Sequence, residues 1–230
     1  MRRICGLVMA TALLLSGVQA SAQSVTFDFE TGDDQGWGNK FSDGSATFPV
    51  VNIGGSQRMA VLRNGDFQEA EYNTGNATDP FFLAMSAAAL NEALYQISYD
   101  YYIDTANWGT GGGTFLQLGT YVNSGSGYYA QNEKDIELDG TQLASGALFQ
   151  GTITETFAAK GYNIPPNGTV LLPETFFRLG LIINGDGPAQ LVHYDNIRVS
   201  LIPEPASLAL VGLAATAMIM ARRRSAPKSY

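Results

Sequence analysis

Apolar and polar residues alternate along most of the chain between residues 23 and 201, with the period of two that is typical of a strand with one buried face. The clearest alternating segments are 25–30, 97–104, 115–118, 177–183 and 192–201. Glycine-rich stretches predict turns between them, for example at 109–113, 123–127 and 184–187. Only the alanine-rich stretch 83–94, after Pro80, favours a short helix or turn. These 179 residues contain no interior linker, so they predict one all-β domain, an antiparallel β-sandwich.

The first 22 residues have the three parts of a secretory signal peptide. Arg2 and Arg3 give a charged start, and residues 4–18 form an apolar stretch. Small residues at 20–22 then offer a cleavage site before Gln23. A permanent membrane anchor would need a longer apolar span and would lack such a site. We therefore expect residues 1–22 to be removed during export.

Residues 202–230 form a second apolar end. A Pro-Glu-Pro motif precedes residues 206–221, of which only Ser207 and Thr216 are mildly polar, and three arginines follow. The motif and the basic cluster consist of Pro203, Glu204, Pro205, Arg222, Arg223 and Arg224. A helix over 206–221 would be about 24 Å long, barely enough to span a bilayer. The arginines are expected to stay on the cytoplasmic side, which leaves the body of the chain outside.

This tail resembles the PEP-CTERM sorting signal of Gram-negative bacteria, which has the same order of motif, short apolar helix and basic end. The resemblance implies that an exosortase recognises and processes the tail. It also implies an inner-membrane intermediate, followed by release to the outer surface or the extracellular matrix. An ordinary C-terminal membrane anchor is the alternative. Either way, such a tail specifies a location and says nothing about activity.

Charge is distributed unevenly between the ends and the middle of the chain. Six of the 13 basic residues and one of the 21 acidic residues lie in the two ends. The middle therefore carries 7 basic and 20 acidic residues, a net charge of −13. Because phosphates would be repelled by such a domain, binding of nucleic acid is excluded. Sugars and divalent cations stay compatible with it.

Cysteine and histidine usage removes further classes of site. Cys5 is the only cysteine and lies in the predicted signal peptide, so disulfides, thiolate metal sites and cysteine nucleophiles are excluded from the domain. His193 is the only histidine, which leaves no histidine-rich metal centre. No catalytic constellation stands out, and the sequence therefore favours a non-enzyme. A glycosidase or lyase, which needs only two carboxylates, is the minor alternative.

The first and last strands carry a more specific pattern. Residues 27–30 read Phe-Asp-Phe-Glu and precede Gly36-Trp37, while residues 194–197 read Tyr-Asp-Asn-Ile. Both resemble the terminal strands of jelly-roll carbohydrate-binding modules, which implies a jelly-roll β-sandwich over residues 23–201. The resemblance also implies a structural Ca²⁺ held by Glu30 and Asp195. Calcium takes about six to eight oxygen ligands, so backbone carbonyls would have to complete the site. Alternatively, Glu30 is a solvated strand residue and Asp195 caps a turn.

Strand alternation also places candidate sugar ligands on an outward face. If Tyr99 and Tyr101 face inward, the residues between and after them face outward. The same argument applies to the next segment, and the loop between the two would hold an indole over a cleft. Aromatic rings beside amides and carboxylates are suited to sugars. The residues expected to form one ligand-binding cleft are Asp100, Tyr102, Trp108, Gln117, Tyr121 and Arg178.

The sequence therefore favours an exported, exosortase-sorted surface or matrix protein whose non-catalytic β-sandwich binds extracellular polysaccharide. A structural or adhesion protein of the matrix, without a sugar pocket, is the main alternative. A surface glycosidase or lyase is less favoured. A concave face lined by aromatic residues would distinguish the polysaccharide-binding protein from the structural or adhesion protein.

Overall fold

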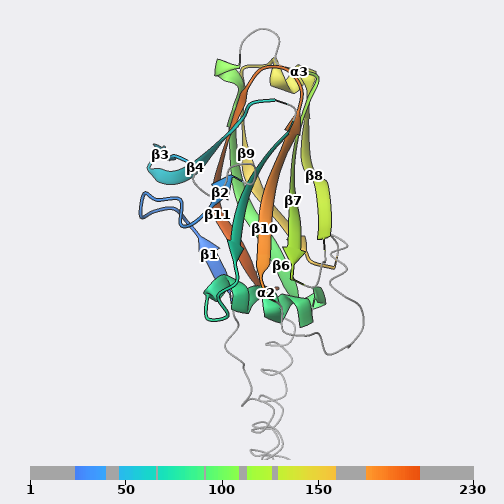
Figure 1. Cartoon of the computed structure of the whole chain (residues 1–230). Coiled ribbons are helices and arrows are strands. Elements are labelled where there is room, and N and C mark those ends of the chain that lie inside the picture. Colours follow the sequence, from blue (N-terminus) through green and yellow to red (C-terminus); the bar gives the residue numbers. More distant parts are fainter. Residues whose placement is uncertain are drawn as a thin grey trace, which may run out of the picture.

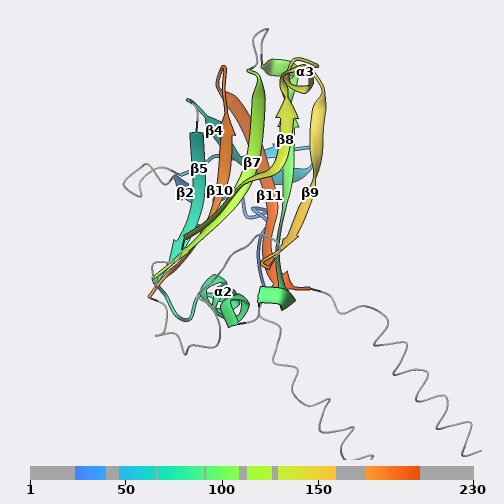
Figure 2. The ribbon, with the colours of Figure 1, turned by 90° about the vertical axis from the view of Figure 1, so that its right-hand side faces the viewer.

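The structure is a computed structural model that describes residues 24–39, 47–65, 67–90, 92–108, 113–125, 129–158 and 175–202. Within these residues the chain forms two antiparallel sheets (Figure 1). The sheets pack face to face, and Figure 2 shows them from the side. The predicted all-β class and the β-sandwich are confirmed.

One sheet has six strands and contains both the first and the last strand of the domain. Its order is β3-β4-β11-β6-β9, and β1 pairs with β11. The strands are β1 (Val25–Phe27), β3 (Val50–Ile53), β4 (Ser56–Arg63), β6 (Tyr95–Asp104), β9 (Leu148–Thr156) and β11 (Gln190–Leu201). Strand β11 pairs with β4 along its first half and with β1 along its second half. The domain therefore begins and ends at neighbouring positions.

The other sheet has five strands in the order β2-β5-β10-β7-β8. They are β2 (Gly38–Asn39), β5 (Phe67–Thr74), β7 (Phe115–Ser124), β8 (Tyr129–Asp139) and β10 (Phe177–Gly185). Consecutive strands β6 and β7 lie in different sheets, because the connection between them crosses from one layer of the sandwich to the other. This crossing decides which candidate residues can meet.

Short helices connect the strands. They are α2 (Pro80–Leu90), η1 (Glu92–Leu94), η2 (Thr105–Asn107) and α3 (Gly140–Leu143). Helix α2 lies across one end of the sandwich (Figure 2). It starts three residues before the predicted stretch, because Pro80 fits the first helical position and Asp79 Oδ1 accepts the backbone N–H of Phe81 at 2.8 Å.

The core lies between the sheets and is filled by the inward rows that the alternation predicted. Ile97, Tyr99 and Ile103 of β6 are buried, as are Leu179, Leu181 and Ile183 of β10. Trp37 is 1% exposed and contacts Phe27 edge to face, with ring centroids 5.5 Å apart. The register of β6 is thus the predicted one, with Asp100 and Tyr102 on the outer face.

Both predicted ends, the signal peptide over 1–22 and the sorting tail from Pro203 to Tyr230, lie outside the described residues. Among the residues that the structure describes, none of the helices has the length and apolar character needed to cross a membrane.

Candidate functional site

The six predicted ligand-binding residues do not form one cleft, and this prediction is wrong. Asp100 and Tyr102 lie on β6 of the six-stranded sheet, and Trp108 follows η2 at the end of that strand. Gln117, Tyr121 and Arg178 lie on strands of the five-stranded sheet. Outward residues of two packed sheets point in opposite directions, so the two groups are separated by the core. The structure thus offers two faces to compare.

The outer face of the six-stranded sheet is hollowed by two adjoining cavities. The first has a volume of about 300 Å³ and is lined by Arg58, Asp100, Tyr101, Tyr102, Gln150, Gly151, Thr152, His193 and Asp195. The second, of about 390 Å³, is lined by Ile53, Leu62, Tyr102, Asp104, Trp108, Ala189, Leu191 and His193. Tyr102 and His193 line both. The two cavities therefore adjoin at these two residues, and together they are named here the outer groove.

Strand register explains why these residues share the outer groove. His193 of β11 pairs with Ala60 of β4 on one side and with Tyr102 of β6 on the other, and Tyr102 pairs with Gln150 of β9. Asp195, Asp100 and Thr152 form the next outward row. Since paired residues in a sheet point to the same face, four strands contribute to one surface.

Aromatic and cationic groups meet at the middle of the outer groove. The rings of Tyr102 and His193 pack edge to face at 5.8 Å, and the Arg58 guanidinium lies 4.7 Å from the centre of the Tyr102 ring. Burial and the nearby charge of Arg58 lower the pKa of His193, so this imidazole is neutral at pH 7. The floor of the groove therefore carries one positive charge beside two rings.

A chain of hydrogen bonds fixes the carboxylates of the first cavity. Thr152 Oγ1 donates to Asp100 Oδ1 at 2.5 Å, and Asn196 Nδ2 donates to Asp100 Oδ2 at 2.8 Å. The backbone N–H of Asn196 donates to Asp195 Oδ1 at 2.7 Å. Asn196 adopts a φ of 49°, where the pairing between β6 and β11 shifts by a bulge. The bulge turns Asn196 toward both acids.

The sequence predicted that Trp108 overhangs the cleft, and this is wrong. Trp108 is 6% exposed and belongs to the core. It still lines the second cavity together with Tyr102. Two leucines beside it, Leu62 and Leu191, are 51% and 36% exposed. The second cavity is therefore the more apolar half of the outer groove.

On the opposite face, Tyr121 is fully buried rather than exposed. Its hydroxyl donates to Glu71 Oε2 at 2.7 Å, and Arg178 Nε lies 3.4 Å from the same oxygen. Burial and the charge of Glu71 raise the pKa of Tyr121 far above its ordinary value. Its ring also covers Gly180, where any side chain would overlap it. Such a tyrosine offers no free ring face for stacking on a sugar.

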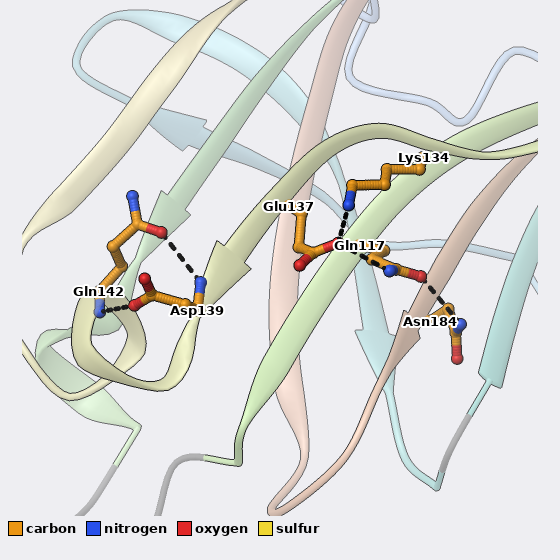
Figure 3. A network of polar contacts seen from close by, with 6 residues as sticks. All are labelled: Gln117, Lys134, Glu137, Asp139, Gln142 and Asn184. Carbon is orange, nitrogen blue, oxygen red and sulfur yellow. Dashed lines mark hydrogen bonds and ion pairs between the residues drawn. The ribbon is translucent and has the colours of Figure 1, made fainter.

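Gln117 lies on this same face, in a row of polar side chains that crosses three strands (Figure 3). Its amide donates to Glu137 Oε2 at 2.9 Å and its carbonyl accepts from Asn184 at 3.2 Å. Lys134 lies 2.5 Å from Glu137. The residues of this row satisfy one another, which suits a hydrated sheet surface as well as a ligand.

The two residues expected to hold calcium are brought together by the fold. Ser56 Oγ lies 3.2 Å from Glu30 Oε1 and 2.6 Å from Asp195 Oδ2, and the backbone N–H of Gln57 also donates to Glu30 at 3.3 Å. Asp195 is 5% exposed, and burial raises the pKa of its carboxyl. Within the described parts of the chain, no three His, Cys, Asp or Glu residues gather as metal ligands. The two carboxylates thus lie close to one another, and two side chains alone do not complete the ligand set of a calcium ion.

Sequence reasoning missed several residues that line the outer groove, above all Arg58, His193, Gln150 and Thr152. Their strands are β4, β11 and β9, whose alternation was either weak or used only to place the core. Had the pairing of β11 with β6 been known, the outward positions of β11 would have indicated His193. Period-two patterns give the face of each residue but not its neighbours.

Comparison with known proteins places the fold but not a family. No family model matches the sequence, and a search of curated proteins also finds no match. A solved carbohydrate-binding module of family 28, specific for non-crystalline cellulose, superposes with a TM-score of 0.50 at 15% identity over 74% of this chain and 89% of that one. Two further modules superpose less closely. One is a family 27 module from Caldicellulosiruptor saccharolyticus in complex with mannohexaose, with a TM-score of 0.44 at 12% identity over 76% of this chain and 95% of that one. The other is a family 11 module from Clostridium thermocellum in complex with a mixed-linked tetrasaccharide, with a TM-score of 0.43 at 16% identity over 78% of this chain and 95% of that one. The domain thus has the β-sandwich fold of carbohydrate-binding modules.

Proposed function

We propose that this chain is an exported, non-catalytic protein that binds extracellular polysaccharide in the outer groove. The observation that carries the proposal is the pair of adjoining cavities, which share Tyr102 and His193 and are lined by residues of five strands. Two adjoining cavities suit a polymer better than a single sugar, because successive units contact successive subsites.

The chemistry of the outer groove supports a sugar ligand. Tyr102 offers an aromatic ring, while Gln150, Asp100 and Arg58 offer planar acceptors and donors for hydroxyl groups. Arg58 Nε and His193 Nδ1 are buried and lack a hydrogen-bond partner within the described residues. Such orphaned polar atoms are rare, and a sugar hydroxyl is a group that would satisfy them.

The carboxylates of the groove support binding rather than hydrolysis. A glycosidase needs one protonated acid and one free carboxylate on either side of the scissile bond. Both oxygens of Asp100 already accept hydrogen bonds, from Thr152 and Asn196. Both oxygens of Asp195 accept as well, from Ser56 and Asn196. Acids held in this way have a fixed orientation, and each oxygen keeps a lone pair with which it accepts a sugar hydroxyl.

A glycan array and affinity electrophoresis with the purified full chain test this function. Tyr102→Ala should weaken retention on the bound polysaccharide, whereas Gln117→Ala, on the opposite face, should leave it unchanged. The reverse result would place binding on the five-stranded sheet. No binding to any glycan would favour a structural or adhesion role for the domain.

We further propose that the chain reaches the outer surface or matrix of a Gram-negative bacterium through its two ends. Removal of residues 1–22 on export, followed by exosortase recognition of Pro203, Glu204 and Pro205, would place the acidic domain outside the cell. Intact-mass analysis of surface material tests this step, since unprocessed protein keeps Arg222, Arg223 and Arg224.

We also propose that a structural Ca²⁺ binds between Glu30 and Asp195. The Ser56 hydroxyl has one hydrogen and lies near both carboxylates. It donates to only one of them at a time, so the other carboxylate oxygen faces the hydroxyl oxygen without a hydrogen between them. Hard oxygen ligands of this kind suit calcium, and an extracellular domain meets enough of it for a weak site. Bound calcium would neutralise the buried charge of Asp195 and join the first and last strands.

A further inference from the structure

We propose that the end of the sandwich formed by α2 and η1 rests on a lipid bilayer, with Leu90 and Leu94 inserted among the headgroups, during the stage at which the C-terminal tail is embedded. This goes beyond polysaccharide binding and rests on the tail-sorting part of the proposed function. The occupant we assign to this surface is neutral lipid.

Helix α2 is apolar on both sides, which is unusual for a helix on a protein surface. Its inner side packs on the core through Phe81, Phe82, Ala84, Met85 and Ala88. Between Pro80 and Leu90, Ser86 is the single polar residue, and no acidic or basic residue is present. A helix exposed to water on one side normally carries charged residues there. The outer side of α2 therefore has the composition of a surface that meets something apolar.

The most exposed large apolar side chains of the described residues lie at this end. Leu90 is 76% exposed and Leu94 of η1 is 56% exposed. Leu90 is the last residue of α2, and Leu94 is the last residue of η1, directly before β6. Neither lines the outer groove. Two leucines bury too little apolar surface to hold a domain on a membrane alone. They are sufficient for a contact when a second anchor, here the C-terminal tail, keeps the domain at the membrane.

The course of the chain indicates what covers this surface. The backbone N–H of Ile202 donates to the carbonyl of Leu94 at 2.8 Å, so the described chain ends beside Leu94. Figure 1 shows β1 and α2 at this same end of the molecule. Only Pro203, Glu204 and Pro205 separate Ile202 from the sixteen-residue apolar segment 206–221. If that segment enters a bilayer, the three-residue linker, which spans about 10 Å when fully extended, keeps Leu94 near the bilayer surface.

The charge of the domain is consistent with neutral rather than anionic lipid. The net charge of −13 over residues 23–201 repels an anionic surface, whereas between Pro80 and Leu94 Glu92 is the only charged residue, so this end meets neutral lipid with little penalty. Vesicles of phosphatidylcholine are therefore the probe.

Site-directed fluorescence tests the contact. The full chain carries Cys5→Ser, so that an introduced cysteine is the only one, and is labelled with an environment-sensitive dye at Leu90→Cys or Leu94→Cys. Leu148→Cys is the matched control, because Leu148 is also an exposed leucine (45%) but pairs with Asp104 at the far end of β6. The vesicles contain a lipid with a nitroxide quencher near its headgroup.

We expect strong quenching at positions 90 and 94 and none at 148. Vesicle flotation that is lost on deletion of residues 206–230 shows that the tail provides the anchor. Flotation without quenching at 90 and 94 overturns this inference and leaves the sorting proposal intact. If the full chain does not float with the vesicles, or floats equally well without residues 206–230, the proposal that the tail is embedded in a membrane is overturned. If the dye at position 90 is protected from both lipid and aqueous quenchers, a protein segment covers α2, and the inference of a lipid contact is overturned.

Discussion

Glu30 and Asp195, which are 165 residues apart in sequence, lie on either side of the Ser56 hydroxyl, at 3.2 Å and 2.6 Å from it. One hydroxyl hydrogen serves only one of the two carboxylates at a time. The first and last strands of the domain are joined at this point by a polar contact that a cation would complete.

Calcium is therefore expected to stabilise the native domain. Binding to the native state alone adds about 2.7 kcal/mol to the free energy of unfolding at a hundredfold excess over Kd. Asp195→Asn should abolish this gain, whereas Asp33→Asn, in the exposed turn after Glu30, should keep it. Thermal melts with calcium and with chelator measure the effect, and equal melting temperatures for the unmodified chain would contradict it.

Without calcium, Asp195 makes stability depend on pH. Burial raises its pKa in the folded state, so the native state holds the proton more tightly than the unfolded state. The free energy of unfolding should therefore fall as pH rises from the ordinary aspartate pKa of 3.8 through the raised value. Asp195→Asn should flatten this slope in chelator. A slope that is identical in the variant would assign the effect to another group.

His193 should produce the opposite slope near neutrality. Its pKa is lowered from 6.5, first by burial and then by Arg58, so the unfolded state takes up the proton first. Stability is fully present above pH 6.5 and is lost as pH falls toward the lowered value. Chemical denaturation between pH 7.5 and 5.5 (about one unit on either side) measures this loss, and His193→Gln should remove it.

Tyr102 should contribute to polysaccharide binding with little effect on folding. The side chain is half-buried on the outer face, so Tyr102→Ala should lower stability by about 1 kcal/mol. Loss of one stacking ring should weaken binding about tenfold, or 1.4 kcal/mol. Isothermal titration with the oligosaccharide identified on the array measures this. Unchanged affinity would remove the outer groove as the binding site.

Gly180 should tolerate no side chain while Tyr121 is present. A Cβ at this position would overlap the Tyr121 ring, and such overpacking costs about 1–3 kcal/mol. Gly180→Ala should therefore lower the midpoint of denaturant unfolding. Adding Tyr121→Leu should recover part of the loss, and a double variant whose losses simply add would show that the two residues are independent.

The sequence alone determined the class of the fold and the buried faces of the most clearly alternating strands. Alternation over 97–104 and 177–183 predicted the buried rows, because side chains on successive strand residues point to opposite faces whatever the partner strand is. The resemblance of the terminal strands to carbohydrate-binding modules implied that Glu30 and Asp195 lie close together, and both carboxylates are within hydrogen-bonding distance of Ser56 Oγ.

Only the tertiary structure decided which faces are shared. Segments 97–104 and 115–121 follow one another in sequence, and alternation predicts one shared outer face for them, but the chain crosses to the other sheet between them. Alternation has no information about that crossing, since it depends on which strands pair over long sequence distances. The same pairing brought His193 and Arg58 beside Tyr102, and it buried Tyr121 against Glu71. The period of a strand is a local property of the backbone, whereas the composition of a site is set by the order of strands in the sheet.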